Sequence, residues 1–209
     1  MLALAYIAAV LTGYFCGSLP TGFLVAKAKG VDIRSVGSGN IGATNVFRIL
    51  GKGPGVFVLL TDALKGLLPV IWLAPALSAI DGSANVEWLR ITAGISAIFG
   101  HNYTCWLRFK GGKGIATSAG AFLGLTPGPL GIAFATWLIF FALSRYVSLA
   151  SIAAAAALPI ATWCLPFETP IRVITTIIGV LAILKHRANI TRLLAGTENR
   201  IGTKKEKAA

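Results

Sequence analysis

Long runs without a charged side chain dominate this sequence and constrain what it can fold into. The first charged residue is Lys27. An uncharged, mainly apolar run of about 25 residues is long enough to cross a bilayer as one helix. Of the 209 residues, 56% are hydrophobic and 12% are charged, whereas a soluble domain carries about 25% charged residues. A soluble fold of this size cannot hide so much apolar surface. The sequence therefore predicts an all-α integral membrane protein.

Seven apolar runs are expected to form a transmembrane helical bundle within a single domain over residues 1–209. The first run could instead be a signal peptide, but no positive segment precedes it and it is of spanning length, so we interpret it as a helix of the mature protein. The fourth and fifth runs are separated only by TPGP, where proline and glycine favour a turn, although one helix over 114–144 is the alternative. A disordered tail is expected over 200–209. The seven runs lie at about 1–25, 54–80, 88–107, 114–125, 129–144, 146–167 and 171–184.

The distribution of positive charge predicts the orientation of the bundle. With seven spans, all of the 19 Lys and Arg residues except Lys65, Arg90 and Arg172 fall on one side. The positive-inside rule then places the N-terminus outside and the C-terminus in the cytoplasm. Merging the fourth and fifth runs would send the basic tail outside, so we reject it. Topology and contact with anionic membrane lipids account for most of the net charge of +12, and no nucleic-acid partner is predicted.

The first cytoplasmic loop contains GSGNIGATN, which begins with the pattern G-x-G-x-x-G. A dinucleotide site would need a preceding strand, and here a membrane helix precedes the loop, so that interpretation fails. An ordinary glycine-rich turn is the simpler alternative. We favour an anion-binding nest, because the nine residues carry no charge and, except for Ile41, no bulky side chain, and an arginine follows one turn later. The expected binding residues are Gly37, Ser38, Gly39, Asn40, Gly42, Thr44, Asn45 and Arg48.

The loop RFKGGKGIATS offers a second candidate for anion binding. It is not a Walker A loop, since Gly114 follows Lys113 where Ser or Thr is required. Two lysines that flank paired glycines before a helix N-terminus can nevertheless hold an anion. A flexible hinge in a positive-inside loop explains the pattern equally well. The residues concerned are Lys110, Gly111, Gly112 and Lys113.

Three further groups of polar residues are candidates. His186 and Asn189 are three residues apart and share a helix face after the last run. Asp62 and Lys65 lie inside the second run, where an ionisable pair indicates function by default; we expect Asp62 to orient a cation without touching substrate. His101 is expected to be a packed, hydrogen-bonded histidine. The three cysteines lie in apolar runs and form no C-x-x-C, so neither a metal site nor a cofactor is predicted.

In order along the chain, five motifs resemble the bacterial acyl-phosphate glycerol-3-phosphate acyltransferase family (PlsY). They are GYFCGSLPTGFLVAK, GSGNIGATN followed by Arg48, Asp62 to Gly66 as D..KG, FKGGKGIAT, and KHRANITRLLAGTEN. The resemblance covers nearly the whole chain. One departure is visible after GHNY, where the family usually has proline and a small apolar residue and this chain has Thr104 and Cys105.

The resemblance implies a seven-span enzyme of the bacterial inner membrane with active-site loops in the cytoplasm. It would transfer an acyl chain from acyl phosphate to the sn-1 hydroxyl of glycerol 3-phosphate, in phospholipid biosynthesis. Carried over by residue, the first loop would hold the acyl-phosphate head, and Arg48, Lys110 and Lys113 would hold glycerol 3-phosphate. His186 and Asn189 would close the site. Ser38 and Asn40 are expected to act with them in catalysis, and Asp62 and Lys65 to support the site. A transporter of phosphorylated small molecules is the main rival, but the outer loops are short and almost featureless.

Overall fold

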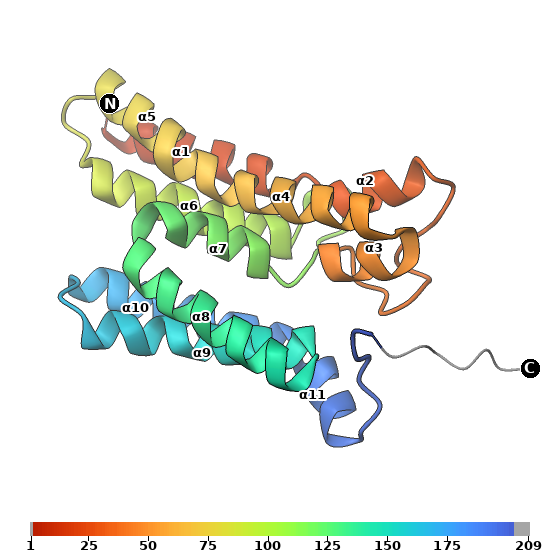
Figure 1. Ribbon diagram of the computed structural model, residues 1–209. Helices are drawn as coiled ribbons and strands as arrows, with labels where there is room; N and C mark the ends of the chain where they lie inside the picture. Colours follow the sequence, from red (N-terminus) through yellow and green to blue (C-terminus); the bar gives the residue numbers. More distant parts are fainter. Residues whose placement is uncertain (1, 203–209) are drawn as a thin grey trace, which may run out of the picture. The chain divides into compact units, whose positions relative to one another are not determined.

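The computed structural model describes residues 2–202, and this part of the chain contains helices and no strand (Figure 1). The chain divides into two compact units, Met1–Pro127 and Gly128–Ala209. Each unit is described here by itself. The helices of the first unit are α1 (Leu2–Ser18), α2 (Thr21–Lys27), α3 (Ala43–Leu50), α4 (Lys52–Leu68), η1 (Pro69–Leu73), α5 (Ala74–Ile80), α6 (Val86–Asn102), η2 (Cys105–Leu107) and α7 (Ile115–Leu125). The remaining helices are α8 (Pro127–Ser144), α9 (Val147–Cys164), α10 (Thr169–Lys185) and α11 (Arg187–Leu194).

Small residues allow the helices of the first unit to pack so closely that their backbones are in contact. A Cβ atom added to Gly66 of α4 would lie 2.0 Å from the carbonyl oxygen of Thr117 in α7. One added to Gly120 of α7 would lie 1.9 Å from the carbonyl oxygen of Ala63 in α4. α1 meets α6 in the same way at Gly17. Packing through small residues is typical of helices in membranes, where apolar bulk gives no preference for protein over lipid.

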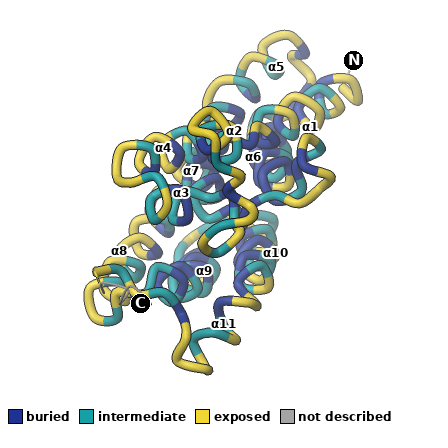
Figure 2. The backbone as a smooth tube through the Cα atoms, turned by 90° about the vertical axis from the view of Figure 1, so that its right-hand side faces the viewer, coloured by how far each residue is buried: buried dark blue, intermediate teal, exposed yellow. Residues whose placement is uncertain are grey.

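The apolar side chains divide between these interfaces and the outer surface of each unit. Buried positions, dark blue in Figure 2, lie where helices meet, whereas many large apolar residues are exposed. Among them are Leu11, Phe57, Trp72, Phe134 and Ile177. An exposed apolar surface of this kind is expected of a helix that faces lipid.

The first apolar run is interrupted at Leu19–Pro20, between α1 and α2. Pro20 has no N–H with which to continue the helix, so carbonyl groups at the end of α1 need other donors. The Thr104 hydroxyl donates to the carbonyl oxygen of Ser18 over 2.5 Å, and Lys65 Nζ donates to that of Leu19 over 2.9 Å. Non-helical backbone at membrane depth is stable only when the protein satisfies it in this way.

The second unit contains an α9–α10 pair and a bent connection to α11. The hydroxyls of Thr162 and Thr175 lie 2.7 Å apart between α9 and α10. Gly179 lets α10 approach the carbonyl oxygen of Ala155, which would lie 2.5 Å from an added Cβ. α10 ends at Lys185, and α11 continues at an angle of 55°.

Each of the seven expected runs coincides with helix, which agrees with an all-α membrane protein. The separation of the fourth and fifth runs is confirmed, since α7 ends at Leu125 and α8 begins at Pro127. Within residues 2–202, four helical stretches are long and apolar enough to cross a membrane, or five if α10 and α11 count as one. α6 has 17 residues and α7 has 11. The count of seven spans, the orientation and the single domain stay predictions.

The chain end differs in part from a free tail. Arg200 Nε donates to the carbonyl oxygen of Ser144 over 2.9 Å, and the backbone N–H of Ile201 donates to that of Arg145 over 3.0 Å. The expected disorder over 203–209 lies outside the described residues.

Candidate active site

The first glycine-rich loop is held together by one buried amide, that of Asn45 at the start of α3. Asn45 Nδ2 donates to the carbonyl oxygens of Ile33, Val36 and Asn40 over 3.2, 3.1 and 2.9 Å. Asn45 Oδ1 accepts from the backbone N–H of Ser38 over 2.9 Å. The side chain is 2% exposed. Its amide therefore lies inside the loop and links backbone groups along it, from Ile33 to Asn40.

The other predicted residues of this loop lie in or next to the segment that this amide links. The Asn40 side chain accepts from the backbone N–H of Gly42 over 2.8 Å, and Gly42 is the N-cap of α3. Gly37 has a φ of 62°, and a Cβ there would lie 2.2 Å from Asn45 Oδ1. A short helix, α3, begins at Ala43 within the motif. It carries Thr44 in its first turn and Arg48 in its last.

The second predicted loop, Lys110–Lys113, is fixed on the last turn of α6. The backbone N–H of Gly112 donates to the carbonyl oxygen of His101 over 3.1 Å. That of Gly111 donates to the carbonyl oxygen of Asn102 over 3.3 Å. Gly112 is buried, whereas Lys110 is exposed. The two lysines therefore stand on either side of a glycine pair that is held against α6.

These two loops lie at the same end of the first unit (Figure 1). One apolar cluster joins them: Leu107 of η2 packs with Ile33, Ile41 and Val46 from the first loop and α3. Val58 of α4 and Ala26 of α2 complete the cluster. Two of the three segments predicted to form the site are thus brought together by shared core residues.

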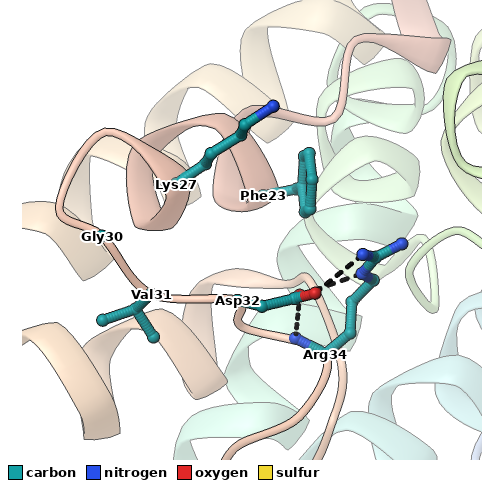
Figure 3. Close-up of a pocket in the computed structure, with 6 residues that line it drawn as sticks. All are labelled: Phe23, Lys27, Gly30, Val31, Asp32 and Arg34. Atoms are coloured by element: carbon teal, nitrogen blue, oxygen red, sulfur yellow. Dashed lines mark hydrogen bonds and ion pairs between the residues drawn. The ribbon is translucent and has the colours of Figure 1, made fainter.

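A shallow pocket of about 350 Å³ opens beside the first loop (Figure 3). Phe23 and Lys27 of α2 line it together with Asp32 and Arg34. Arg34 lies over the Phe23 ring at 4.8 Å and forms an ion pair with Asp32 at 2.7 Å. Hydrogen bonds from the side chain and the backbone of Arg34 lower the pKa of Asp32 to about 2. Sequence reasoning did not single out this pocket.

The predicted residues of the second unit are both buried at the α10–α11 bend. His186 is 3% exposed and Asn189 is 5% exposed. His186 Nδ1 lies 2.8 Å from the carbonyl oxygen of Ala182. Because a carbonyl oxygen can only accept, Nδ1 carries the proton in this bond, and a neutral imidazole then presents Nε2 as an acceptor.

Asn189 belongs to a carboxylate network that sequence reasoning missed. Glu198 accepts from Ser148 Oγ over 3.0 Å, Asn189 Nδ2 over 2.8 Å and Arg192 Nε over 2.7 Å. Burial raises the pKa of Glu198, but these three hydrogen bonds outweigh it and leave the pKa below its ordinary value. The network ties the segment after α11 to the start of α9.

The sequence profile of the family described as glycerol-3-phosphate acyltransferase matches residues 7–196. The chain belongs to the glycerol-3-phosphate acyltransferase family. The glycerol-3-phosphate acyltransferase of Geobacter sulfurreducens is 49% identical over 187 residues, which cover 90% of this chain and 93% of that one. That of Geotalea daltonii is 47% identical over 190 residues, which cover 91% and 94%.

Two solved crystal structures of PlsY, an integral membrane glycerol 3-phosphate acyltransferase, are similar to this acyltransferase. Both are 40% identical to it and cover 95% of this chain and 96% of theirs. The glycerol 3-phosphate form matches with a TM-score of 0.85, and the lysophosphatidic acid form with 0.81. The chain is therefore a membrane-bound acyltransferase rather than a transporter.

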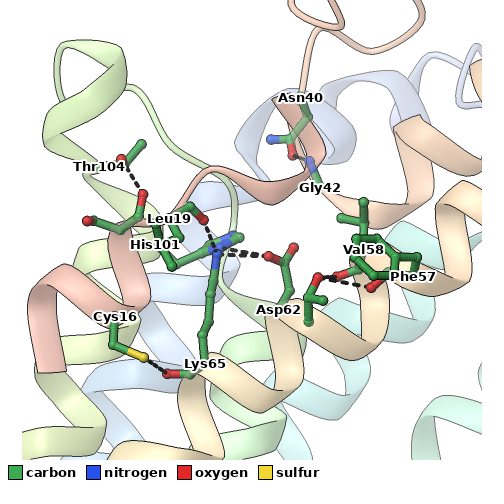
Figure 4. Close-up of polar contacts among 12 residues, drawn as sticks. Cys16, Leu19, Asn40, Gly42, Phe57, Val58, Asp62, Lys65, His101 and Thr104 are labelled. Carbon is green, nitrogen blue, oxygen red and sulfur yellow. Dashed lines mark hydrogen bonds and ion pairs between the residues drawn. The ribbon is translucent and has the colours of Figure 1, made fainter. Parts of the chain in front are cut away.

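This acyltransferase also contains the predicted intramembrane ion pair. Lys65 Nζ lies 2.8 Å from Asp62 Oδ1, and their side chains are 6% and 4% exposed (Figure 4). Within residues 2–202, no group of three His, Cys, Asp or Glu residues lies close enough to hold a metal ion. The chemistry of the described residues is that of hydrogen-bond donors, cations and two buried imidazoles, those of His101 and His186.

Proposed function

We propose that this chain transfers an acyl group from acyl phosphate to the sn-1 hydroxyl of glycerol 3-phosphate, with lysophosphatidic acid and inorganic phosphate as products. Family membership supports an acyltransferase, and relatives solved in glycerol 3-phosphate and lysophosphatidic acid forms support the acceptor and the product. The observation that carries the proposal is one apolar cluster that joins two glycine-rich loops. The first loop leads into α3, which bears Arg48, and the second bears Lys110 and Lys113.

The residues divide between the two phosphate groups. Ser38, Asn40 and Thr44, with the backbone amides of Gly37, Gly39 and Gly42, are proposed to bind the acyl-phosphate head, where N–H groups favour anions. Asn45 is proposed to contact the same head in addition to closing the loop. Arg48, Lys110 and Lys113, with the amides of Gly111 and Gly112, are proposed to bind glycerol 3-phosphate. Because two anionic phosphate groups must approach, these cations offset their repulsion.

The donor is already activated, because an acyl phosphate is a mixed anhydride. The acceptor hydroxyl oxygen bonds to the acyl carbonyl carbon, the bond from that carbon to the phosphate oxygen breaks, and phosphate leaves. No acyl-enzyme is needed, since correct positioning can supply about 7–11 kcal/mol. Donors around the leaving phosphate stabilise the charge that develops there.

The hydroxyl proton has two proposed destinations, His186 Nε2 and the phosphate of the substrate. The bond from Nδ1 to Ala182 favours the first, because it orients the ring and leaves Nε2 in the acceptor form. Asn189 is proposed to hold the acceptor beside it. Asp62 and Lys65 are proposed to support the site without touching substrate.

We further infer a seven-span arrangement in the bacterial inner membrane, with the N-terminus outside and the loops in the cytoplasm. The concentration of cations in the connecting segments supports this orientation and contact with anionic lipids. The acyl chain would lie between helices in the bilayer, which explains why such an enzyme is embedded.

The decisive experiment supplies palmitoyl phosphate to detergent-purified protein with and without glycerol 3-phosphate. We expect phosphate release and lysophosphatidic acid, detected by mass spectrometry, only when both substrates are present. Release that is independent of glycerol 3-phosphate would instead indicate a hydrolase. Activity with a thioester donor but not with palmitoyl phosphate would refute the proposed donor.

His186 variants separate the two routes of the proton. If Nε2 receives it, His186→Ala loses at least tenfold in kcat at neutral and higher pH. The difference from wild type should shrink at low pH, because the wild-type imidazole is then itself protonated and cannot accept. If the phosphate receives it, His186→Gln retains most of the activity. Unchanged turnover of His186→Ala at every pH would remove this residue from the mechanism.

A further inference from the structure

We propose that the buried Asp62–Lys65 pair and His101 hold the Lys110–Gly114 loop in position. In this way they set the affinity for glycerol 3-phosphate, the phosphate-bearing acceptor. The three side chains are positioning residues that act through the loop. The inference rests on the proposed function, in which Lys110 and Lys113 hold glycerol 3-phosphate.

The ion pair is a fixed point within the first unit. Lys65 Nζ contacts Asp62 Oδ1 at 2.8 Å and also donates to the carbonyl oxygen of Leu19 over 2.9 Å. It thus joins α4 to the break between α1 and α2 (Figure 4). Removing one partner of a buried pair leaves the other charge without compensation, so each side chain holds the other in place.

His101 lies between this pair and the glycine loop. Its Nδ1 is 3.8 Å from Asp62 Oδ1, and its ring is buried. On the other edge, a Cβ added to Gly112 would lie 2.1 Å from His101 Nε2. The imidazole therefore touches the backbone of Gly112, and a shift of the ring must shift the loop midway between its two lysines.

The far end of the loop is anchored to the same helices. A Cβ added to Gly114 would lie 2.5 Å from Asn102 Oδ1, so the end of α6 also contacts the last loop residue. α7 begins at Ile115 and packs against α4 at Gly66, one residue after Lys65. α4 and α6 thus hold both ends of the loop. The Asp62–Lys65 pair on α4 and His101 on α6 link these two helices next to the loop.

This arrangement predicts an effect on one substrate only. The loop carries cations assigned to glycerol 3-phosphate, whereas the acyl-phosphate head is assigned to the other loop. Loss of a contact that is made equally in the ground state and the transition state raises KM and leaves kcat unchanged. Loss of the support should therefore raise KM for the acceptor and leave KM for the donor in place.

The experiment compares Asp62→Asn and His101→Gln with wild type in the palmitoyl phosphate assay, with Lys113→Ala as reference. Each support variant is expected to raise KM for glycerol 3-phosphate at least fivefold, with kcat and KM for palmitoyl phosphate within twofold. In Asp62→Asn/Lys113→Ala the acceptor KM should rise by less than the product of the two single effects, because both changes act on the same loop. Glu87→Gln, in an exposed pair at the other end of α6, is the matched control and should equal wild type.

A purely structural role gives a different result. It lowers kcat in proportion to the folded fraction and leaves both KM values unchanged, and this outcome would overturn the inference. Gly112→Ala keeps the test available if the charge variants misfold. Its methyl group collides with His101 Nε2 and should raise the acceptor KM alone, so wild-type behaviour of Gly112→Ala would also refute the support.

The inference and the proposed function can fail separately. If Lys113→Ala raises the acceptor KM and neither support variant does, the support is refuted and the lysine assignment stands. If the support variants raise it and Lys113→Ala does not, the support stands and the role of Lys113 is wrong.

Discussion

Asn45 commits its whole side-chain amide to the inside of the first loop. One amide group bonds three carbonyl oxygens and one N–H. This side chain fixes the spacing of Ser38 and Asn40, because it bonds to the backbone of both residues. The residue therefore serves the loop first, and contact with substrate would be an additional role.

Asn45→Ala is expected to destabilise the fold by about 2 kcal/mol or more, because buried carbonyl groups lose their donor. Activity should fall with it. Asn85→Ala is a matched control at the N-cap of α6. It should cost about 1 kcal/mol and leave activity unchanged. Unfolding in detergent measures both; equal stability losses in the two variants would contradict the scaffold role.

Arg34→Gln should raise the pKa of Asp32 from about 2 towards its ordinary value, since the side-chain hydrogen bonds from Arg34 are the main cause of the shift. The backbone N–H bond remains, so recovery should be incomplete. A folded-state pKa that is lowered contributes stability above the unfolded pKa, and this contribution is lost as pH falls towards 2. Carboxyl carbon NMR of the protein in micelles measures the titration; an unchanged midpoint would refute the assigned cause.

The roles of single residues were only partly predictable from the sequence. The glycine pattern and Arg48 indicated an anion loop, but nothing local indicates that Asn45 reaches back 12 residues to Ile33. Glu198 was missed although a signal existed. It is the one carboxylate among the cations of 185–202, and a lone acid in such a segment is often a structural partner for them.

Among the elements, the α1–α2 break depends on side chains that are remote in sequence. Hydropathy continues across Leu19–Pro20, so the run was predicted as one helix even though Pro20 marks the interruption. The donors come from residues 65 and 104. Thr104 is one of the two positions at which the sequence analysis found a departure from the family pattern, and its hydroxyl donates to the carbonyl oxygen of Ser18.

Thr104→Val removes that hydroxyl at nearly constant shape. The Ser18 carbonyl then lacks this donor in a buried place, which should cost about 1–3 kcal/mol. Thr104→Ser keeps the donor and should lose less than half as much. Thermal unfolding of the two variants in the same detergent provides the comparison, and equal destabilisation would show that packing of the methyl group matters more than the bond.

Glu198→Gln tests how the segment after α11 is held. The substituted amide places a donor where Arg192 Nε also donates, so this contact is lost while Ser148 and Asn189 can still bond the remaining oxygen. Because the pKa of Glu198 is lowered on folding, its contribution is present above about pH 4.3 and disappears as pH falls. The stability difference between wild type and variant should therefore shrink on acidification; a difference that grows would contradict the network.

At the scale of the whole molecule, hydropathy predicted where the helices lie, whereas the number of spans stays a prediction. Every expected run became helix, because backbone in lipid has no other partner than itself. α6, with 17 residues, and α7, with 11, are too short for a simple length test for crossing, and α10 and α11 pass it only when they are taken together. Length alone cannot decide whether these helices cross the bilayer, since small residues and helix bends change the thickness that a short helix must span.

Labelling can establish the orientation of the second span. In a variant without the three native cysteines, Gly82→Cys and Lys52→Cys place thiols at opposite ends of Lys52–Ile80. Both positions are exposed. A membrane-impermeant maleimide should label residue 82 in intact spheroplasts and residue 52 only after permeabilisation. The reverse pattern would invert the predicted topology.

The contacts of Gly66 and Gly120 with opposing backbone have a consequence for mutational scanning. Neither position has room for a methyl group, so almost every replacement should fail a growth selection as completely as loss of a reacting group would. A scan of all single substitutions in this enzyme would then find the α4–α7 contact, at Gly66 and Gly120, as intolerant of change as the two glycine-rich loops. Purified variants at that contact should show fewer folded molecules, each with ordinary turnover.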